Sequence, residues 1–285
     1  MLHADRCSGM YAVLTDDPDL ARAGIGDRSY HFVEYVDGSR NEPIEDPNVV
    51  HSVACWGDTE TVEAEPDRAA VAADGTRATA TGEGGWGTVC PTDPDYRDGV
   101  LERIEELEGD VRLTTLGFPG EAYCQCKRCD RRFADAESDD RTAWRTTVVT
   151  DFVAAVARRV DGDLLATAYP DPYPGQLEQR AGIDLAALSA FVDGVLVPLC
   201  SPGYETSYWV ESIARGFDAT LRELETDVEL AIQLSGARIE PDRLAEVTRT
   251  VEPYADEIVY GTYPDDAETV RETIELLREQ AAVPG

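Results

Sequence analysis

Basic residues are scarce in this chain of 285 residues. It has 25 Lys and Arg against 57 Asp and Glu, a formal net charge of −32, and Lys127 is the single lysine. Nucleic acids and anionic membranes are bound through basic patches, so this composition argues against both partners. The acidic residues run along the whole length, which is typical of proteins from the salty cytoplasm of halophiles, where salt screens their mutual repulsion.

Several catalytic motifs are also missing. The three histidines, His3, His31 and His51, lie in the first fifth of the chain, and no G-x-S-x-G motif accompanies them. This argues against a serine or cysteine triad. There is no phosphate-binding G-x-x-x-x-G-K-[ST] loop, and Lys127 stands among cysteines, which disfavours nucleotide hydrolysis and Schiff-base chemistry.

Long apolar runs are absent as well. No stretch approaches the roughly 18 residues of a membrane-spanning helix, and the first residues show no basic segment leading into an apolar one. We therefore expect a cytoplasmic protein without a membrane partner.

Four of the seven cysteines form the most informative pattern that is present. Cys124, Cys126 and Cys129 stand in a C-x-C-x-x-C cluster, and Cys90 precedes a proline upstream. Four thiolates make a closed tetrahedral site that favours zinc and leaves no position for substrate, which predicts a structural Zn²⁺. The alternative is a set of free buried thiols, since a reduced cysteine packs as a small hydrophobe.

Alternating strands and helices predict the fold. We expect strands at 10–14, 30–36, 49–56, 111–116, 164–169, 194–199, 228–234 and 257–260, and helices at 142–160, 185–191, 210–224 and 267–282. This alternation predicts parallel pairing and a single (β/α)8 TIM-like barrel domain over residues 1–285, with an irregular first quarter. The alternative is an open doubly wound α/β sheet.

Two segments resemble a known family. Residues 65–75, followed by 89–91 and 94–97, are similar to a segment of the catalytic barrel of family 42 glycoside hydrolases (β-galactosidases) and related glycosidases. The cysteine cluster at 123–129 resembles the run after that family's fourth strand, where the equivalent four cysteines bind zinc. The resemblance covers roughly residues 65–160. It implies a barrel that acts on a carbohydrate at its C-terminal face.

The family's catalytic carboxylates do not carry over. Thr114 and Thr115 stand where the acid/base is expected, and Gln233 stands where the nucleophile is expected. The sequence therefore argues against retaining hydrolysis by that pair, because this reaction needs two carboxylates about 5 Å apart. Asp171, between prolines after a strand, and Glu121, before the cysteines, are the substitutes that we propose as catalytic residues. For each, the alternative is one more acidic surface residue.

Aromatic and amide side chains near strand ends are the candidate sugar-binding groups. Flat aromatic faces suit the apolar faces of pyranose rings, whereas ordinary packing of loops over the barrel is the competing explanation. The candidates are Trp56, Trp86, Tyr169, Tyr173, Tyr204, Trp209, Gln233 and Tyr263.

Three functions remain open. The first is glycoside hydrolysis, and the second is a catalytically degenerate barrel that binds a carbohydrate or a protein partner. The third is a zinc-stabilised barrel enzyme of unrelated chemistry, because this fold hosts many reactions.

Overall fold

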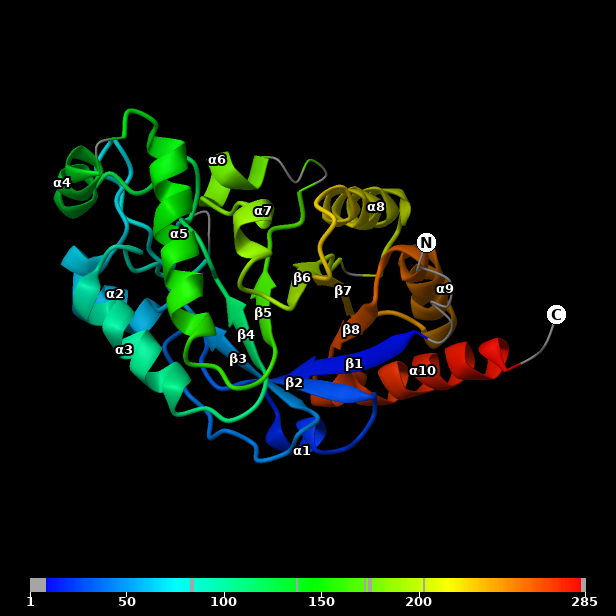
Figure 1. Cartoon of the computed structure of the whole chain (residues 1–285). Coiled ribbons are helices and arrows are strands. Elements are labelled where there is room, and N and C mark those ends of the chain that lie inside the picture. The colour runs from blue at the N-terminus through cyan, green and yellow to red at the C-terminus, as the bar shows by residue number, and fades with distance from the viewer. Residues whose placement is uncertain are drawn as a thin grey trace.

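Eight parallel strands close into one barrel in the computed structural model, which describes residues 9–82, 85–136, 138–171, 173, 176–201 and 203–282. Each strand pairs with the next, and β8 pairs with β1 (Figure 1). The strands are β1 Met10–Thr15, β2 Arg28–Phe32, β3 Val49–Ala54, β4 Val111–Thr114, β5 Leu164–Thr167, β6 Gly194–Pro198, β7 Glu229–Ser235 and β8 Glu257–Gly261. The predicted barrel is confirmed, and the open sheet is excluded.

Helices follow most strands and surround the barrel (Figure 1). They are α1 Pro18–Ala21, α2 Thr59–Ala64, α3 Pro94–Glu105, α4 Lys127–Asp135, α5 Arg141–Ala157, α6 Leu177–Ala181, α7 Leu185–Leu188, α8 Tyr208–Glu223, α9 Pro241–Val251 and α10 Ala267–Ala281. Short 3-10 helices are η1 Pro66–Arg68, η3 Glu252–Tyr254 and η4 Pro264–Asp266. None of the helices in the described ranges is long and apolar enough to cross a membrane.

The first quarter is irregular, as predicted. α1 has four residues, and no helix occurs in the described segment between β2 and β3. β2 ends at Phe32, four residues before the predicted end, because Glu34 turns away to form an isolated antiparallel bridge with Arg40. The segment between β3 and β4 is the opposite case: it carries α2, η1 and α3 and contains Cys90.

Side chains alternate between the inside of the barrel and the layer under the helices. Residues two apart along a strand point the same way. The inward set is a small apolar cluster: Ala12, Leu14, Tyr30, Val50, Leu165, Leu196, Ala231 and Val259, with Phe32 packed against it. The outward set joins the helices in one large core, to which α5 contributes Phe152 and Val153. Strand register therefore decides which polar residues enter the barrel.

An ion pair occupies the N-terminal end of the barrel interior. The Arg28 guanidinium binds Glu257 through two hydrogen bonds of 2.7 and 2.8 Å, and the Tyr30 hydroxyl donates to the same carboxylate at 2.5 Å. Glu257 is buried and its charge is satisfied. This end of the barrel is therefore a structural plug, and the strands open toward the loops at their C-terminal ends.

Candidate metal centre and cleft

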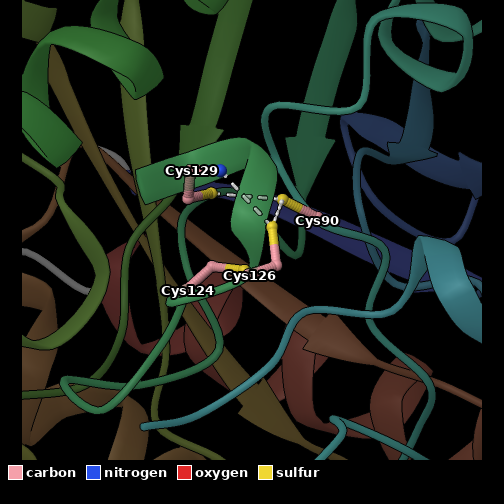
Figure 2. Close-up of side chains that lie close together, drawn as sticks. All are labelled: Cys90, Cys124, Cys126 and Cys129. Atoms are coloured by element: carbon pink, nitrogen blue, oxygen red, sulfur yellow. Dashed lines mark hydrogen bonds between the residues drawn. The ribbon is translucent and has the colours of Figure 1, made fainter. Parts of the chain in front are cut away.

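The four predicted cysteines converge on one point. Figure 2 shows Cys90, from the segment after β3, facing the cluster that leads into α4. The Cys90 Sγ lies 3.7 Å from that of Cys126 and 3.4 Å from that of Cys129, and all four sulfurs lie within 4.8 Å of one another. A tetrahedral ion about 2.3 Å from each sulfur would hold them about 3.8 Å apart. The donor set therefore fits a tetrahedral thiolate-bound metal such as zinc.

Backbone and hydroxyl groups surround these sulfurs. The Val71 amide donates to the Cys124 Sγ at 3.4 Å, and the Cys129 amide donates to the Cys126 Sγ at 3.4 Å. The Thr92 Oγ1 lies 3.2 Å from the sulfurs of Cys90 and Cys129. Hydrogen bonds of this kind orient metal ligands and stabilise thiolates. Hydrogen bonds from neighbouring thiols, Cys124 first, lower the pKa of Cys126.

The local sequence explains how the cluster forms. Cys126 is the N-cap of α4, so its sulfur lies at the positive end of the helix. Arg141, at the start of α5, donates to the Cys124 carbonyl at 2.8 Å and pairs with Asp130 at 2.8 Å. The cluster thus joins the long segment after β3 to the segment after β4, two of the loops that surround the barrel mouth.

A cleft of about 260 Å³ lies beside this wall at the C-terminal face. It is lined by Trp86, Thr88, Thr115, Gly117, Phe118, Pro119, Tyr169 and Arg180, which come from the loops after β3, β4 and β5. Thr115 takes a left-handed backbone conformation, φ 47°, which is strained for a β-branched residue. Strain of this kind concentrates at functional sites. Three aromatic residues, Trp86, Phe118 and Tyr169, and one cation therefore line the same small space.

Asp171 is paired with Arg180, the arginine that lines this cleft. The residue is 6% exposed, the Tyr173 amide donates to its Oδ1 at 2.9 Å, and the Arg180 Nη1 lies 3.5 Å from its Oδ2. The Arg180 guanidinium also stacks over the Tyr169 ring at 5.6 Å. Asp171 is therefore a buried carboxylate tied to a cleft-lining cation, a setting different from that of an ordinary surface acid.

Glu121 has an exposed side chain after β4. Its backbone carbonyl, like that of Gly120, accepts a hydrogen bond from Arg145 of α5, which also binds the carbonyls of Gln179 and Arg180. Arg145 thereby fastens the loop after β4 to α6. Glu121 and Arg180 belong to segments held together by one buried arginine, which the sequence analysis did not single out.

Two of the predicted sugar-binding aromatics are core residues, which corrects that assignment. Trp56 is fully buried and packs on Phe152 of α5, with ring centroids 4.8 Å apart. Tyr204 is also fully buried, and its hydroxyl accepts a hydrogen bond from the Ser235 amide at 2.7 Å. Each follows a strand end, yet its ring turns into the core, where it gains more from burial than from solvent.

The remaining candidates are distributed around the face. Trp86 and Tyr169 line the cleft. Tyr173 is 67% exposed and Tyr263 is 59% exposed, so both are free to contact a ligand. Trp209 packs partly against the core at the start of α8. Gln233 is half-buried on β7 at an inward position.

The positions of the family's catalytic pair hold no carboxylate. Thr114 ends β4, the next residue is Thr115, and Gln233 lies near the end of β7. Asp58, another acid near a strand end, is the N-cap of α2 and also accepts a hydrogen bond from the Tyr96 hydroxyl at 3.1 Å. The face therefore has an acid layout of its own, with Asp58 and Asp171 as buried carboxylates.

A larger hollow of about 590 Å³ lies at the opposite end of the barrel. It is lined in part by Arg28, Asp163, Asp193 and Glu229. Burial, followed by neighbouring acids, raises the pKa of Asp163 and of Glu229. In barrels of this kind the N-terminal face serves stability and the C-terminal face carries the chemistry, so the smaller cleft is the functional candidate.

Comparison with known proteins supports the barrel fold. No protein-family model matches the sequence, and neither does any curated protein sequence. Among solved structures, the chain is similar to the PgaB (BpsB) glycoside hydrolase domain from Bordetella bronchiseptica, with 13% identity, a TM-score of 0.68, and coverage of 98% of this chain and 100% of that one.

Two further structures match over part of their length. An alpha-L-fucosidase isoenzyme 2 from Paenibacillus thiaminolyticus gives a TM-score of 0.69 at 12% identity, covering 96% of this chain and 50% of that one. A beta-galactosidase from Rahnella sp. R3 gives 0.63 at 11% identity, covering 97% and 57%. The chain thus spans about half the length of these two enzymes. The structural likeness shows that the chain shares the barrel fold of these glycoside hydrolases. Because the identities are so low, it shows the fold alone and does not establish family 42.

Proposed function

We propose that this protein acts on a carbohydrate at the C-terminal face of its barrel, in the cleft between the loops after β3, β4 and β5. One observation carries the proposal: Trp86 and Tyr169 line a small cleft together with Arg180, which is paired with the buried Asp171. Aromatic faces bind the apolar faces of sugar rings, while charged groups bind hydroxyls. The names of the three similar structures support the same substrate class.

We assign hydrolysis to Asp171 and Glu121 in an inverting reaction. That reaction uses two carboxylates about 6.5–9.5 Å apart, one activating water and the other protonating the leaving oxygen. Asp171 is the base in this scheme, because hydrogen bonding from the Tyr173 amide and pairing with Arg180 hold its position. Glu121, exposed after β4, supplies the proton.

Zinc has a structural role in this proposal. Cys90, Cys124, Cys126 and Cys129 would hold it, and four protein ligands leave no site for substrate. When bound, the ion crosslinks the segments after β3 and β4. The thiol cluster then fixes the wall of the cleft to which Trp86 and Thr115 belong.

A second function is favoured by a specific observation. Threonine and glutamine occupy the two strand ends where related barrels carry catalytic carboxylates. A barrel that binds a sugar or a protein partner without cleaving a bond would have this appearance.

The experiment that separates these functions combines metal analysis, binding and turnover on one sample. Protein purified in concentrated KCl is assayed for zinc, for binding of neutral sugars and for hydrolysis of nitrophenyl glycosides. We expect one zinc per chain and turnover that Asp171→Asn abolishes while sugar binding remains. Glu205→Gln, an exposed acid after β6, is the matched control and leaves turnover unchanged. Binding without turnover in the parent protein supports the degenerate barrel, and absence of both refutes the carbohydrate proposal.

We further propose that the protein works in a high-salt cytoplasm, because a net charge of −32 destabilises a compact chain unless salt screens it. The thermal unfolding midpoint is expected to rise steadily with KCl concentration. A midpoint that is highest at low salt contradicts the proposal.

A further inference from the structure

Arg112 of β4 points into the barrel. It pairs in register with Ser52 of β3 and Leu165 of β5, and Leu165 belongs to the inward apolar cluster. The guanidinium carbon of Arg112 lies 5.2 Å from the centre of the Phe32 ring and 5.7 Å from that of Tyr30. The residue is 2% exposed. A cationic side chain therefore occupies the middle of the barrel.

This cation has no acidic partner in the described part of the chain. Its Nε and Nη1 are buried and make no hydrogen bond to any described residue. The inward carboxylate of Glu257 is already bound by Arg28 and Tyr30. Burial lowers the pKa of Arg112 to about 10, so the side chain stays charged at neutral pH. An unpaired buried charge costs several kcal/mol, and a fold that carries one needs a compensating role for it.

Neighbouring groups do not supply the missing negative charge. Burial raises the pKa of the Tyr30 hydroxyl, and it raises the pKa of the Cys200 thiol to about 11. The negative forms of Tyr30 and Cys200 would stabilise the Arg112 cation. Both groups are neutral at pH 7, so this stabilisation is missing. The interior around this guanidinium is positive.

Two hydroxyl groups with unmet hydrogen bonds face the same region. The Oγ of Ser52 and the Oγ1 of Thr167 are buried, with no partner in the described residues. Ser52 is the register partner of Arg112, and Thr167 lies on β5 two residues beyond Leu165, so both side chains point inward. Three adjacent strands thus present donors toward the barrel interior.

These donors do not line the proposed cleft themselves, but they lie on the strands that lead to it. Arg112 is three residues before Thr115, and Thr167 is two before Tyr169, and both Thr115 and Tyr169 line the cleft. Thr167 is also the last residue of β5, at the rim of the barrel. A short group that extends downward from a ligand in the cleft would approach the donors.

We infer that Arg112, with Ser52 and Thr167, recognises the carboxylate of an acidic sugar, so that the substrate class is uronic-acid-containing glycans. This rests on the proposed carbohydrate function of the cleft. A planar carboxylate matches the guanidinium fork and accepts hydrogen bonds from both hydroxyls. It also supplies the negative charge that the barrel interior lacks.

Calorimetric titration in concentrated KCl tests the inference. Glucuronate and galacturonate are compared with glucose and galactose, on the parent protein and on Arg112→Met. We expect the parent to bind at least one uronate about tenfold to a hundredfold more tightly than its neutral counterpart, the range that a hydrogen bond to a charged group supports. Arg112→Met loses this preference, keeps its neutral-sugar affinity and melts no lower than the parent. Arg97→Met removes a cation that stacks on Phe152 outside the barrel, and the preference persists.

The other outcomes overturn the inference in distinguishable ways. Equal affinity of the parent for uronates and neutral sugars refutes it and leaves the carbohydrate function standing. A preference that survives in Arg112→Met assigns recognition to another residue. Acetate that competes as well as a uronate shows a free-anion site, and a marked fall in melting temperature in Arg112→Met shows a structural role. Absence of any sugar binding refutes the proposed function and this inference together.

Discussion

Two arginines, one on α5 and one on β4, are both buried but differ in their hydrogen-bond partners. Arg145 of α5 lies under the loops and donates to four backbone carbonyls, those of Gly120, Glu121, Gln179 and Arg180. Arg112 of β4 lies inside the barrel, where two of its three nitrogens have no partner in the described residues. Burial lowers the pKa of each to about 10. The Nε of Arg145 also lacks a partner in the described residues, but both of its terminal nitrogens are bonded and hold loops in place. The unbonded donors of Arg112 are available to a ligand.

The largest effect is expected from removing the metal site. Like Arg145, this site holds loop segments in place. Zinc binding contributes about 10 kcal/mol or more in zinc-finger peptides. Cys126→Ser, or treatment with a chelator, should unfold the wall formed by the segments after β3 and β4. Hydrogen exchange should show faster exchange over 86–92 and 120–136, with strands β6 to β8 still protected. Cys55→Ser, a buried cysteine outside the cluster, is the control for thiol loss alone. Uniform exchange across the barrel would contradict a local role.

The next effect distinguishes the two arginines directly. Arg145→Met leaves four loop carbonyls without their donor and should cost about 3 kcal/mol of unfolding free energy. Arg112→Met replaces an unpartnered buried cation by an apolar chain and should change that free energy by about 1 kcal/mol or less, or increase it. Denaturant titration in concentrated KCl measures both. Equal losses in the two variants would remove the distinction between a structural and a ligand-binding arginine.

The smallest effect concerns two buried histidines. Unlike the two arginines, they are buried in the neutral form. His31 and His51 are register partners on β2 and β3, and both are buried. Burial lowers the pKa of each, and the neighbouring His51 lowers that of His31 further. Below about pH 6.5, the value in an unfolded chain, the unfolded state binds more protons, so the free energy of unfolding falls as the pH falls.

Denaturant titrations at pH 7.5 and pH 5.5 in constant high salt check this sign. His31→Asn should reduce the difference between the two pH values, because the remaining imidazole titrates without its neighbour. A parent protein that is more stable at pH 5.5, with that gain unchanged in the variant, would show that buried acids such as Asp163, whose pKa is raised by burial, dominate instead.

Much of the fold was predictable because it follows local patterns. All eight strands match predicted segments, and the predicted helix at 142–160 corresponds to α5, whose apolar face includes Trp144, Val148 and Phe152. α9 was missed, although Pro241 at its first turn is a typical helix start. The early end of β2 was also missed, because the bridge between Glu34 and Arg40 depends on the loop that follows.

The candidate site was only partly predictable. The four cysteines were found because three stand within six residues, and their convergence with Cys90 agrees with the predicted metal site. Proximity to a strand end did not show whether an aromatic ring faces ligand or core, so Trp56 and Tyr204 were misassigned. Arg112 and Arg180 were overlooked, because the chain has many arginines and nothing local shows which of them faces an acid, solvent or a ligand.

The sequence by itself determined the barrel and the thiol cluster, because strand alternation and ligand spacing are written in neighbouring residues. Only the tertiary structure decided which buried charged side chains have a partner. Arg112 stands between Val111 and Leu113, and Arg145 follows Trp144, and these neighbours do not show which arginine has partners. Strand register turns Arg112 into the barrel, away from free acids, while α5 places Arg145 against two carbonyls of the loop after β4 and two of α6. Whether a buried charged side chain has a partner depends on contacts between segments that are distant in the sequence. The same holds for the lack of a partner at Arg112 among the described residues.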